Sequence, residues 1–144
     1  EATAQVRHAS RLFVCAAHLR VPVFAVVMRK GYGLGAMGMT AGGFHAPVFT
    51  IAWPSAEFGA MGLEGAVRLG YRKELEAAAD GAEREALFRS LLAQMAARGA
   101  ATEMASTLEI DAVIDPAETR AWLARGLDGS SVAAATGRGG LDTW

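Results

Sequence analysis

Glycines are the residues whose types and spacing bear most directly on chemistry in this chain. Residues 29–38 read RKGYGLGAMG, and Gly42 and Gly43 follow shortly after. Small residues let main-chain N–H groups approach a ligand closely, and two such groups aimed at one oxygen form an oxyanion hole. The same stretch contains the spacing Gly33-x-Gly35-x-x-Gly38 of the dinucleotide-binding fingerprint. A third interpretation is purely structural, because glycines also allow close packing of a helix on a sheet.

Two features of the sequence argue against dinucleotide binding. Arg29, Lys30 and Tyr32 separate the glycines from the preceding apolar strand, whereas the fingerprint glycines follow their strand directly. The next predicted strand ends in Trp53-Pro54 and carries no acidic residue for a ribose. A phosphate-binding P-loop is disfavoured as well, since no Lys-Ser/Thr pair follows the glycines.

Other reactive side chains give weaker signals. The three histidines lack metal-ligand spacing, and Cys15 with His18 would supply only two ligands, so we predict no metal site. Core packing is the expected role of Cys15 and His18. The serines lack the glycine-flanked elbow of a serine hydrolase.

Length and composition describe one folded domain. The chain has 144 residues, of which 52% are hydrophobic and 20% charged, which excludes intrinsic disorder. A net charge of −1 provides no basic field for nucleic acid or an anionic membrane. The longest apolar run, residues 21–28, is too short to span a bilayer, so we expect a soluble protein. One cysteine and no visible signal peptide favour the cytoplasm, and the start at Glu1 suggests a piece of a larger chain.

Periodicity predicts alternating helices and strands. Capping boxes at Asp80 with Glu83, and at Asp115 with Glu118, mark two helix starts. The chain from residue 128 to 144 has no apolar period and is predicted to be a disordered tail. The expected elements are a helix over 5–19, a strand over 21–28, the glycine loop with a helix after it, strands over 48–53 and 57–60, a helix over 63–79, a helix from 80, a strand over 112–114 and a helix from 115 to about 126. This order predicts an α/β fold.

Several motifs resemble one enzyme family, the carboxyltransferase (β) subunits of biotin-dependent acyl-CoA carboxylases that act on propionyl-, acetyl- or methylcrotonyl-CoA. The stretch RHASR at 7–11 resembles the family's Arg-His-Gly-Ala-Lys helix, and IDAVIDPAETR at 110–120 resembles its closing Val-Asp-Ala-Val-Ile-x-Pro-x-Asp-Thr-Arg. RKGYGLGA at 29–36, AWPSAE at 52–57 and MGLEGA at 61–66 also fit, in the same order. The resemblance implies a crotonase-like (ClpP-like) fold, with residues 1–127 forming the latter part of the C-terminal domain.

The resemblance also implies that two separate sets of N–H donors act in the site. A carboxyl group carried on biotin is transferred to the α-carbon of an acyl-CoA. The protein contributes two sets of oriented N–H groups, which act as hydrogen-bond donors. One set stabilises the thioester enolate and belongs to the N-terminal domain. The other set holds the ureido oxygen of biotin, and the alignment places its donors on Leu34 and Gly35, with Gly33 or Ala36 able to share the role. Leu34 stands where the family has glycine, but any residue other than proline retains the N–H donor.

Two further positions take roles from the resemblance. Met37 falls where many short-chain members have an acidic residue in the acyl pocket, so an apolar Met37 indicates a different, larger acyl group. Met61 and Gly62 open the helix that borders the biotin site in the family; core filling is the alternative role of Met61.

The implied partners are an acyl-CoA, a biotin carboxylase with its biotin carrier, the N-terminal carboxyltransferase domain and further copies in a hexamer. This chain has no Met-Lys-Met motif, so biotin must arrive on another chain or domain. The implied class is a ligase or transferase of fatty acid metabolism. Three alternatives stay open: an acyl-CoA decarboxylase subunit, a crotonase-type hydratase or isomerase that would use Glu57 or Glu64, and an inactive fragment that serves only assembly.

Overall fold

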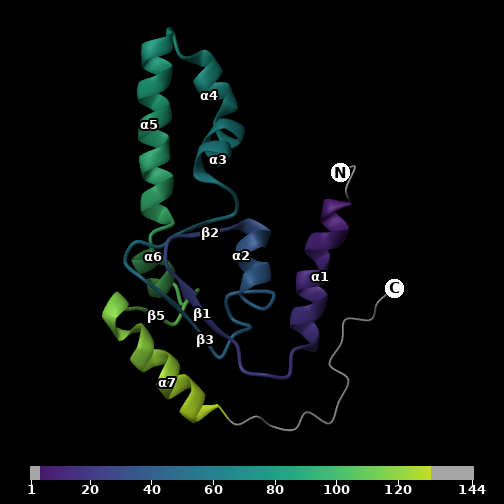
Figure 1. Cartoon of the computed structure of the whole chain (residues 1–144). Coiled ribbons are helices and arrows are strands. Elements are labelled where there is room, and N and C mark those ends of the chain that lie inside the picture. Colours follow the sequence, from purple (N-terminus) through teal and green to yellow (C-terminus); the bar gives the residue numbers. More distant parts are fainter. Residues whose placement is uncertain (1–3, 131–144) are drawn as a thin grey trace.

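The computed structural model describes residues 4–130 and consists of a small parallel sheet core with a helical arm (Figure 1). The elements follow one another in the order α1 (Gln5–His18), β1 (Phe24–Val27), β2 (Lys30–Tyr32), α2 (Gly33–Met39), β3 (Phe49–Ala52), β4 (Glu57–Gly59), α3 (Leu63–Gly70), α4 (Arg72–Ala77), α5 (Gly81–Arg98), α6 (Ala101–Ser106), β5 (Ala112–Val113), a 3-10 turn (Pro116–Glu118) and α7 (Thr119–Gly129). The predicted α/β alternation is therefore present.

The central sheet has the strand order β1-β3-β5, and all its strands are parallel. Phe24 pairs with Phe49, and Ile51 pairs with Ala112. Every residue of β3 is buried, as expected for the middle strand of a sheet covered on both faces. A second sheet consists of β2 and β4, also parallel, with Tyr32 opposite Gly59.

Each face of the central sheet has its own apolar cluster. On one face Phe49, Ile51 and Ile114 pack with Trp122 and Leu123 of α7. Phe24 stacks at 4.9 Å between ring centroids on Phe49. The cluster on the other face consists of five buried residues from β3, β4, α6 and the turns after β3 and before β5. They are Ala52, Ala56, Phe58, Ala101 and Ile110.

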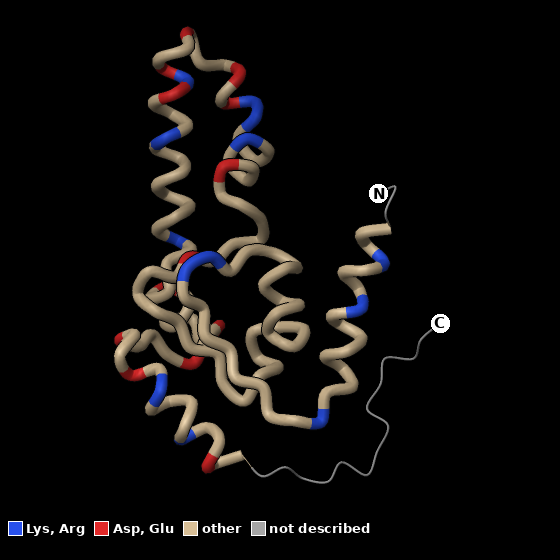
Figure 2. Tube along the Cα trace, viewed as in Figure 1, with Lys and Arg blue, Asp and Glu red and all other residues tan. Residues whose placement is uncertain are grey.

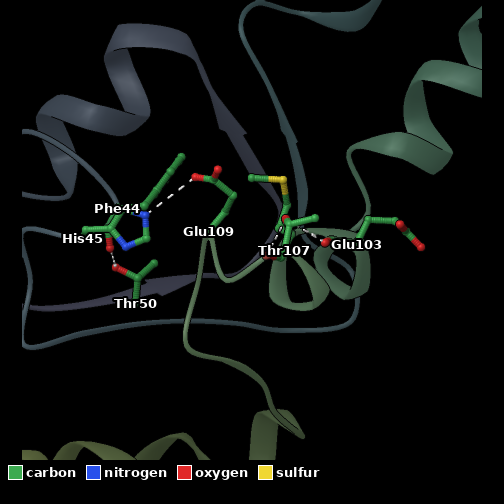
Figure 3. A network of polar contacts seen from close by, with 7 residues as sticks. Phe44, His45, Thr50, Glu103, Thr107 and Glu109 are labelled. Carbon is green, nitrogen blue, oxygen red and sulfur yellow. Dashed lines mark hydrogen bonds and ion pairs between the residues drawn. The ribbon is translucent and has the colours of Figure 1, made fainter.

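A short polar network ties the loop between α2 and β3 to the core (Figure 3). The Thr50 hydroxyl donates to the Phe44 carbonyl oxygen at 2.6 Å, and the Thr50 N–H donates to Asp111 Oδ2 at 2.7 Å. Outside the core, His45 Nε2 lies 3.7 Å from Glu109 Oε2. These contacts hold the segment that joins the glycine-rich helix to the central strand.

The arm consists of α3, α4 and α5 and extends away from the sheets (Figure 1). The half-buried face of α5, which packs on α3 and α4, is apolar and includes Leu87, Phe88, Leu91, Leu92 and Met95. Arg68 covers the Phe88 ring at 4.6 Å from its centroid. Charged residues gather on the outer part of the arm, whereas α2 carries none (Figure 2).

Several sequence predictions need correction. The helix expected over 63–79 is broken at Tyr71, directly after Gly70, whose helix propensity is low. The Asp80 side chain caps the Glu83 N–H as predicted, but the Glu83 carboxylate accepts from Ala79 instead of Asp80. The capping box at Asp115 is confirmed.

The remaining differences concern the ends of the chain. Cys15 and His18 were expected in the core, but both are exposed because α1 packs only one side against α2. The strand expected over 21–28 is shorter, Phe24–Val27, and α7 continues to Gly129, past the predicted end near Gly126. Most of the predicted tail, residues 131–144, lies outside the described residues.

Candidate functional site

The glycine run forms a strand-to-helix junction and not the loop that was predicted. Residues Lys30–Tyr32 pair with β4, and the chain turns from β2 into α2 at Gly33 without any connecting residue. Gly33 has a φ of +56°, a left-handed conformation that glycine adopts at low cost. Gly33 therefore provides the backbone conformation with which β2 passes directly into α2.

The junction leaves the predicted donors unpaired. N–H groups in the first turn of a helix have no acceptor inside that helix. Within residues 4–130, the N–H groups of Leu34 and Gly35 make no hydrogen bond to any other group. The Leu34 side chain is 72% exposed, and the space beside the Gly35 Cα is open. Both amides are thus available to an external acceptor.

Two hollows flank the junction, and the predicted site residues divide between them. Gly33 and Met37 line a largely apolar cavity of about 420 Å³. Met61 and Gly62 line a second cavity of about 640 Å³. Leu63 belongs to both walls, so the two cavities are neighbours. Leu34, Gly35 and Ala36 line neither cavity, so within the described chain these amides border open surface.

The larger cavity contains a hydrogen-bonded pair of polar side chains that the sequence did not reveal, although Glu57 was considered for the hydratase or isomerase alternative. Lys30, Tyr32 and Glu57 line it together, and the Tyr32 hydroxyl donates to Glu57 Oε2 at 2.6 Å. Burial raises the pKa of Tyr32 to about 12; the hydrogen bond to Glu57 and its negative charge act in the same direction, while Arg29 opposes them. Tyr32 is therefore a neutral hydrogen-bond donor at physiological pH.

A signal for this cluster was present in the sequence. Lys30 and Tyr32 are two residues apart, so a strand places them on the same face. The glycines around Lys30 and Tyr32 favoured a loop. The shared face of these two residues becomes recognisable only from the pairing of β2 with β4.

No set of three or more metal-binding side chains comes together within residues 4–130. Over the same residues, no helix combines the length and the hydropathy required to cross a membrane.

Comparison with known proteins identifies the family. A family model described as the carboxyl transferase domain matches residues 2–133. This chain belongs to the carboxyl transferase domain family. The family resemblance drawn from the sequence motifs is therefore confirmed.

Curated relatives of this carboxyl transferase domain are much longer than the chain. This chain is 36% identical over 116 residues to the propionyl-CoA carboxylase carboxyltransferase subunit of Haloferax mediterranei. The match covers 80% of this chain and 22% of that protein. The chain is 35% identical over 130 residues to the methylmalonyl-CoA carboxyltransferase 12S subunit of Propionibacterium freudenreichii subsp. shermanii, covering 85% and 23%. The chain thus spans about a fifth of the length of these relatives.

Solved structures confirm the predicted crotonase-like fold, of which this carboxyl transferase domain forms a part. A single-chain, multi-domain long-chain acyl-CoA carboxylase is 53% identical, with a TM-score of 0.73 over 85% of this chain and 12% of that one. The transcarboxylase 12S hexamer is 29% identical, with a TM-score of 0.74 over 94% and 27%.

The expected separation between the glycines and a preceding strand was wrong. Lys30 and Tyr32 belong to a strand themselves, so Gly33 does follow a strand directly. The glycine run is assigned to a carboxyl transferase domain because the family model matches residues 2–133.

Proposed function

We propose that this chain is part of the carboxyltransferase component of an acyl-CoA carboxylase, and that it supplies the N–H donors for the biotin side of the reaction. Its match to the family model from residue 2 to 133 supports the reaction class. The single observation that carries the site assignment is the pair of unpartnered amides at Leu34 and Gly35.

These amides suit the ureido oxygen of biotin, which is a hydrogen-bond acceptor. The carboxyl group is supplied by carboxybiotin when that cofactor is bound. The N–H groups of Leu34 and Gly35 donate to the ureido oxygen and stabilise the negative charge that develops on it during transfer. Gly33 and Ala36 flank the two donors and can share the role, and no general base from this chain is required.

The segment that opens α3 forms the second part of the proposed biotin site. Met61 and Gly62 precede Leu63, the residue common to the two cavities. Met61 is 43% exposed, so core filling does not account for its position. We assign Met61 and Gly62 to the wall beside the bicyclic ring.

Met37 supports a large apolar acyl group as the substrate. It lines the 420 Å³ cavity with Phe44, Phe58, Met95 and Met104, whose side chains are apolar. An acyl chain gains free energy from such walls in proportion to the apolar area buried. The long-chain acyl-CoA carboxylase is also the solved structure with the higher identity of the two described above. We therefore propose long-chain acyl-CoA as the substrate class.

The proposed function requires partners that lie outside this chain. They are a biotin carboxylase with its biotin carrier, the N-terminal carboxyltransferase domain and further copies of the subunit. The 12S transcarboxylase relative assembles as a hexamer, which supports an oligomer here. The setting that we propose is the cytoplasm and the pathway is fatty acid metabolism, with the complete complex acting as a ligase.

One alternative has a specific observation in its favour. The chain is 33% identical over 75 residues to the methylmalonyl-CoA decarboxylase subunit alpha of Propionigenium modestum. A decarboxylase would use the same donors in the opposite direction, removing the carboxyl group from the acyl-CoA.

A coupled assay tests these proposals. The full-length protein containing this sequence is combined with its biotin carboxylase partner, ATP, labelled bicarbonate and acetyl-, propionyl- or longer acyl-CoA. The proposal expects labelled carboxyacyl-CoA, most rapidly from the longer chains. Release of carbon dioxide from a carboxyacyl-CoA, with no fixation under any condition, would favour the decarboxylase.

A further inference from the structure

The two-stranded sheet β2–β4 has one face turned to the core and one face turned to the larger cavity. Gly31 and Phe58, which are opposite each other in the register, are buried. Lys30, Tyr32 and Glu57 lie on the other face and line the 640 Å³ cavity. Alternation along the strands thus places these polar side chains on one surface.

The Tyr32–Glu57 hydrogen bond joins the two strands across that surface. Its length of 2.6 Å falls in the range of an O–H donor on a carboxylate, among the stronger hydrogen bonds in proteins. Each strand has only three residues, so the ladder itself contains few main-chain bonds. The Tyr32–Glu57 bond is thus a side-chain link between β2 and β4 in addition to their main-chain pairing.

The bond also connects the two segments of the proposed biotin site. Tyr32 immediately precedes Gly33, and the donors Leu34 and Gly35 follow without any intervening loop. Glu57 begins β4, which leads through Ala60 to Met61 and Gly62. A shift of β2 against β4 would move the donors relative to the start of α3.

We propose that Tyr32 and Glu57 are a positioning pair, which holds the Leu34 and Gly35 amides in place relative to Met61 and Gly62. This inference rests on the proposed role of those amides. Neither side chain needs to touch the reacting atoms. Small misplacements of donors are costly, since about 1 Å can reduce a rate roughly 100-fold.

The test compares variants of the full-length carboxyltransferase. Tyr32→Phe keeps the ring beside Gly59 and removes only the hydroxyl group, and Glu57→Leu removes the acceptor. We expect each to lower kcat about tenfold or more, with KM for acyl-CoA nearly unchanged, because donors that act on charge developed in the transition state affect kcat and kcat/KM equally. Glu57→Gln retains an acceptor oxygen and is expected to restore most of kcat.

A matched control separates positioning from general loss of a hydrogen bond. Ser55→Ala removes the bond from Ser55 Oγ to the Met28 carbonyl oxygen, 2.7 Å long, in the turn before β4. It is expected to leave kcat unchanged. Unchanged kcat in Tyr32→Phe and Glu57→Leu would overturn the inference, as would a loss of kcat that the Ser55→Ala variant shares or that follows a fall in Tm.

Failure of this inference can be distinguished from failure of the proposed function. Replacing the Leu34 amide with an ester removes a donor directly. If the ester lowers kcat while Tyr32→Phe does not, only the positioning role is wrong. If the ester has no effect, the donor assignment is wrong, and the positioning pair with it.

Discussion

Gly33 and Ala60 lie so close that a Cβ on Gly33 would be 2.7 Å from the Ala60 carbonyl oxygen. Atoms at that distance overlap, and the overlapping group is backbone, which cannot move aside easily. The contact lies at the ends of β2 and β4, where the chain turns into α2. The position of the Leu34 and Gly35 amides therefore depends on a glycine at residue 33.

Replacing Gly33 with alanine should destabilise the fold. The left-handed φ of +56° costs a non-glycine residue roughly 1–2 kcal/mol, and the overlap with Ala60 adds to that. Gly35→Ala is the matched control, because nothing lies within 4 Å of its Cβ position. In a helix that change is expected to stabilise by roughly 0.5–1 kcal/mol. Urea unfolding measures both, and equal stabilities of the two variants would contradict the structure.

The Tyr32 phenol should titrate well above an ordinary tyrosine, because burial, the Glu57 hydrogen bond and the Glu57 charge raise its pKa to about 12. The folded-state pKa exceeds the unfolded value of about 10. Its stabilising contribution is thus complete below about pH 10 and is lost as the pH rises from about 10 to about 12. The chain has two tyrosines, so ultraviolet titration of a Tyr71→Phe variant reports Tyr32 alone. Tyrosinate forming near pH 10 in the folded protein would refute this.

Removing the acceptor for the Thr50 amide should weaken the central sheet. Thr50 is fully buried and its N–H donates to Asp111 Oδ2. Asp111→Ala leaves that donor unpaired, at a cost of roughly 1–3 kcal/mol. Asp111→Asn retains an oxygen acceptor and should lose less. Thermal unfolding of both variants checks the order, and an Asn variant as unstable as the Ala variant would count against the role of the bond.

An acidic residue at position 37 should change the choice of acyl group. Met37 lines the largely apolar cavity, where a carboxylate would remove apolar surface that a long hydrocarbon chain could bury. We expect Met37→Asp to lower the ratio of kcat/KM for long-chain over propionyl-CoA by about tenfold. Met39→Asp places the same charge on the same helix, at a side chain that is 77% exposed. An unchanged preference in Met37→Asp would remove Met37 from the acyl pocket.

Local sequence signals predicted those elements that local interactions stabilise. Asp115, Pro116 and Glu118 mark a helix start by themselves, and the structure has the capping box. The apolar strands over 48–53 and 112–114 were found for the same reason, since buried parallel strands are uniformly apolar.

The glycine run was not predictable from local signals because distant contacts determine its structure. Residues Lys30–Tyr32 become a strand only by pairing with β4, whose residues come 27 positions later in the register. Gly38 becomes helical where Leu12 and Phe13 of α1 pack beside it. Glycine propensity alone favours a loop there.

The donor role of Leu34 and Gly35 stays a prediction from the resemblance. The structure leaves both amides without a partner in residues 4–130, as that role requires. Sequence reasoning did not find the Tyr32–Glu57 bond, because it depends on the β2–β4 register.

The most direct measurement replaces the Leu34 amide with an ester in the full-length enzyme, using the α-hydroxy analogue of leucine. This keeps the side chain and removes the N–H; the Gly33 carbonyl also becomes a weaker acceptor, an effect of ester substitution that the control shares. The same substitution at Leu108, an exposed residue whose N–H bonds Ala105 in a turn, is the control. We expect kcat for carboxyl transfer to fall roughly 100- to 1,000-fold at Leu34 and to stay near wild type at Leu108. A Leu34 ester with wild-type kcat would contradict this expectation.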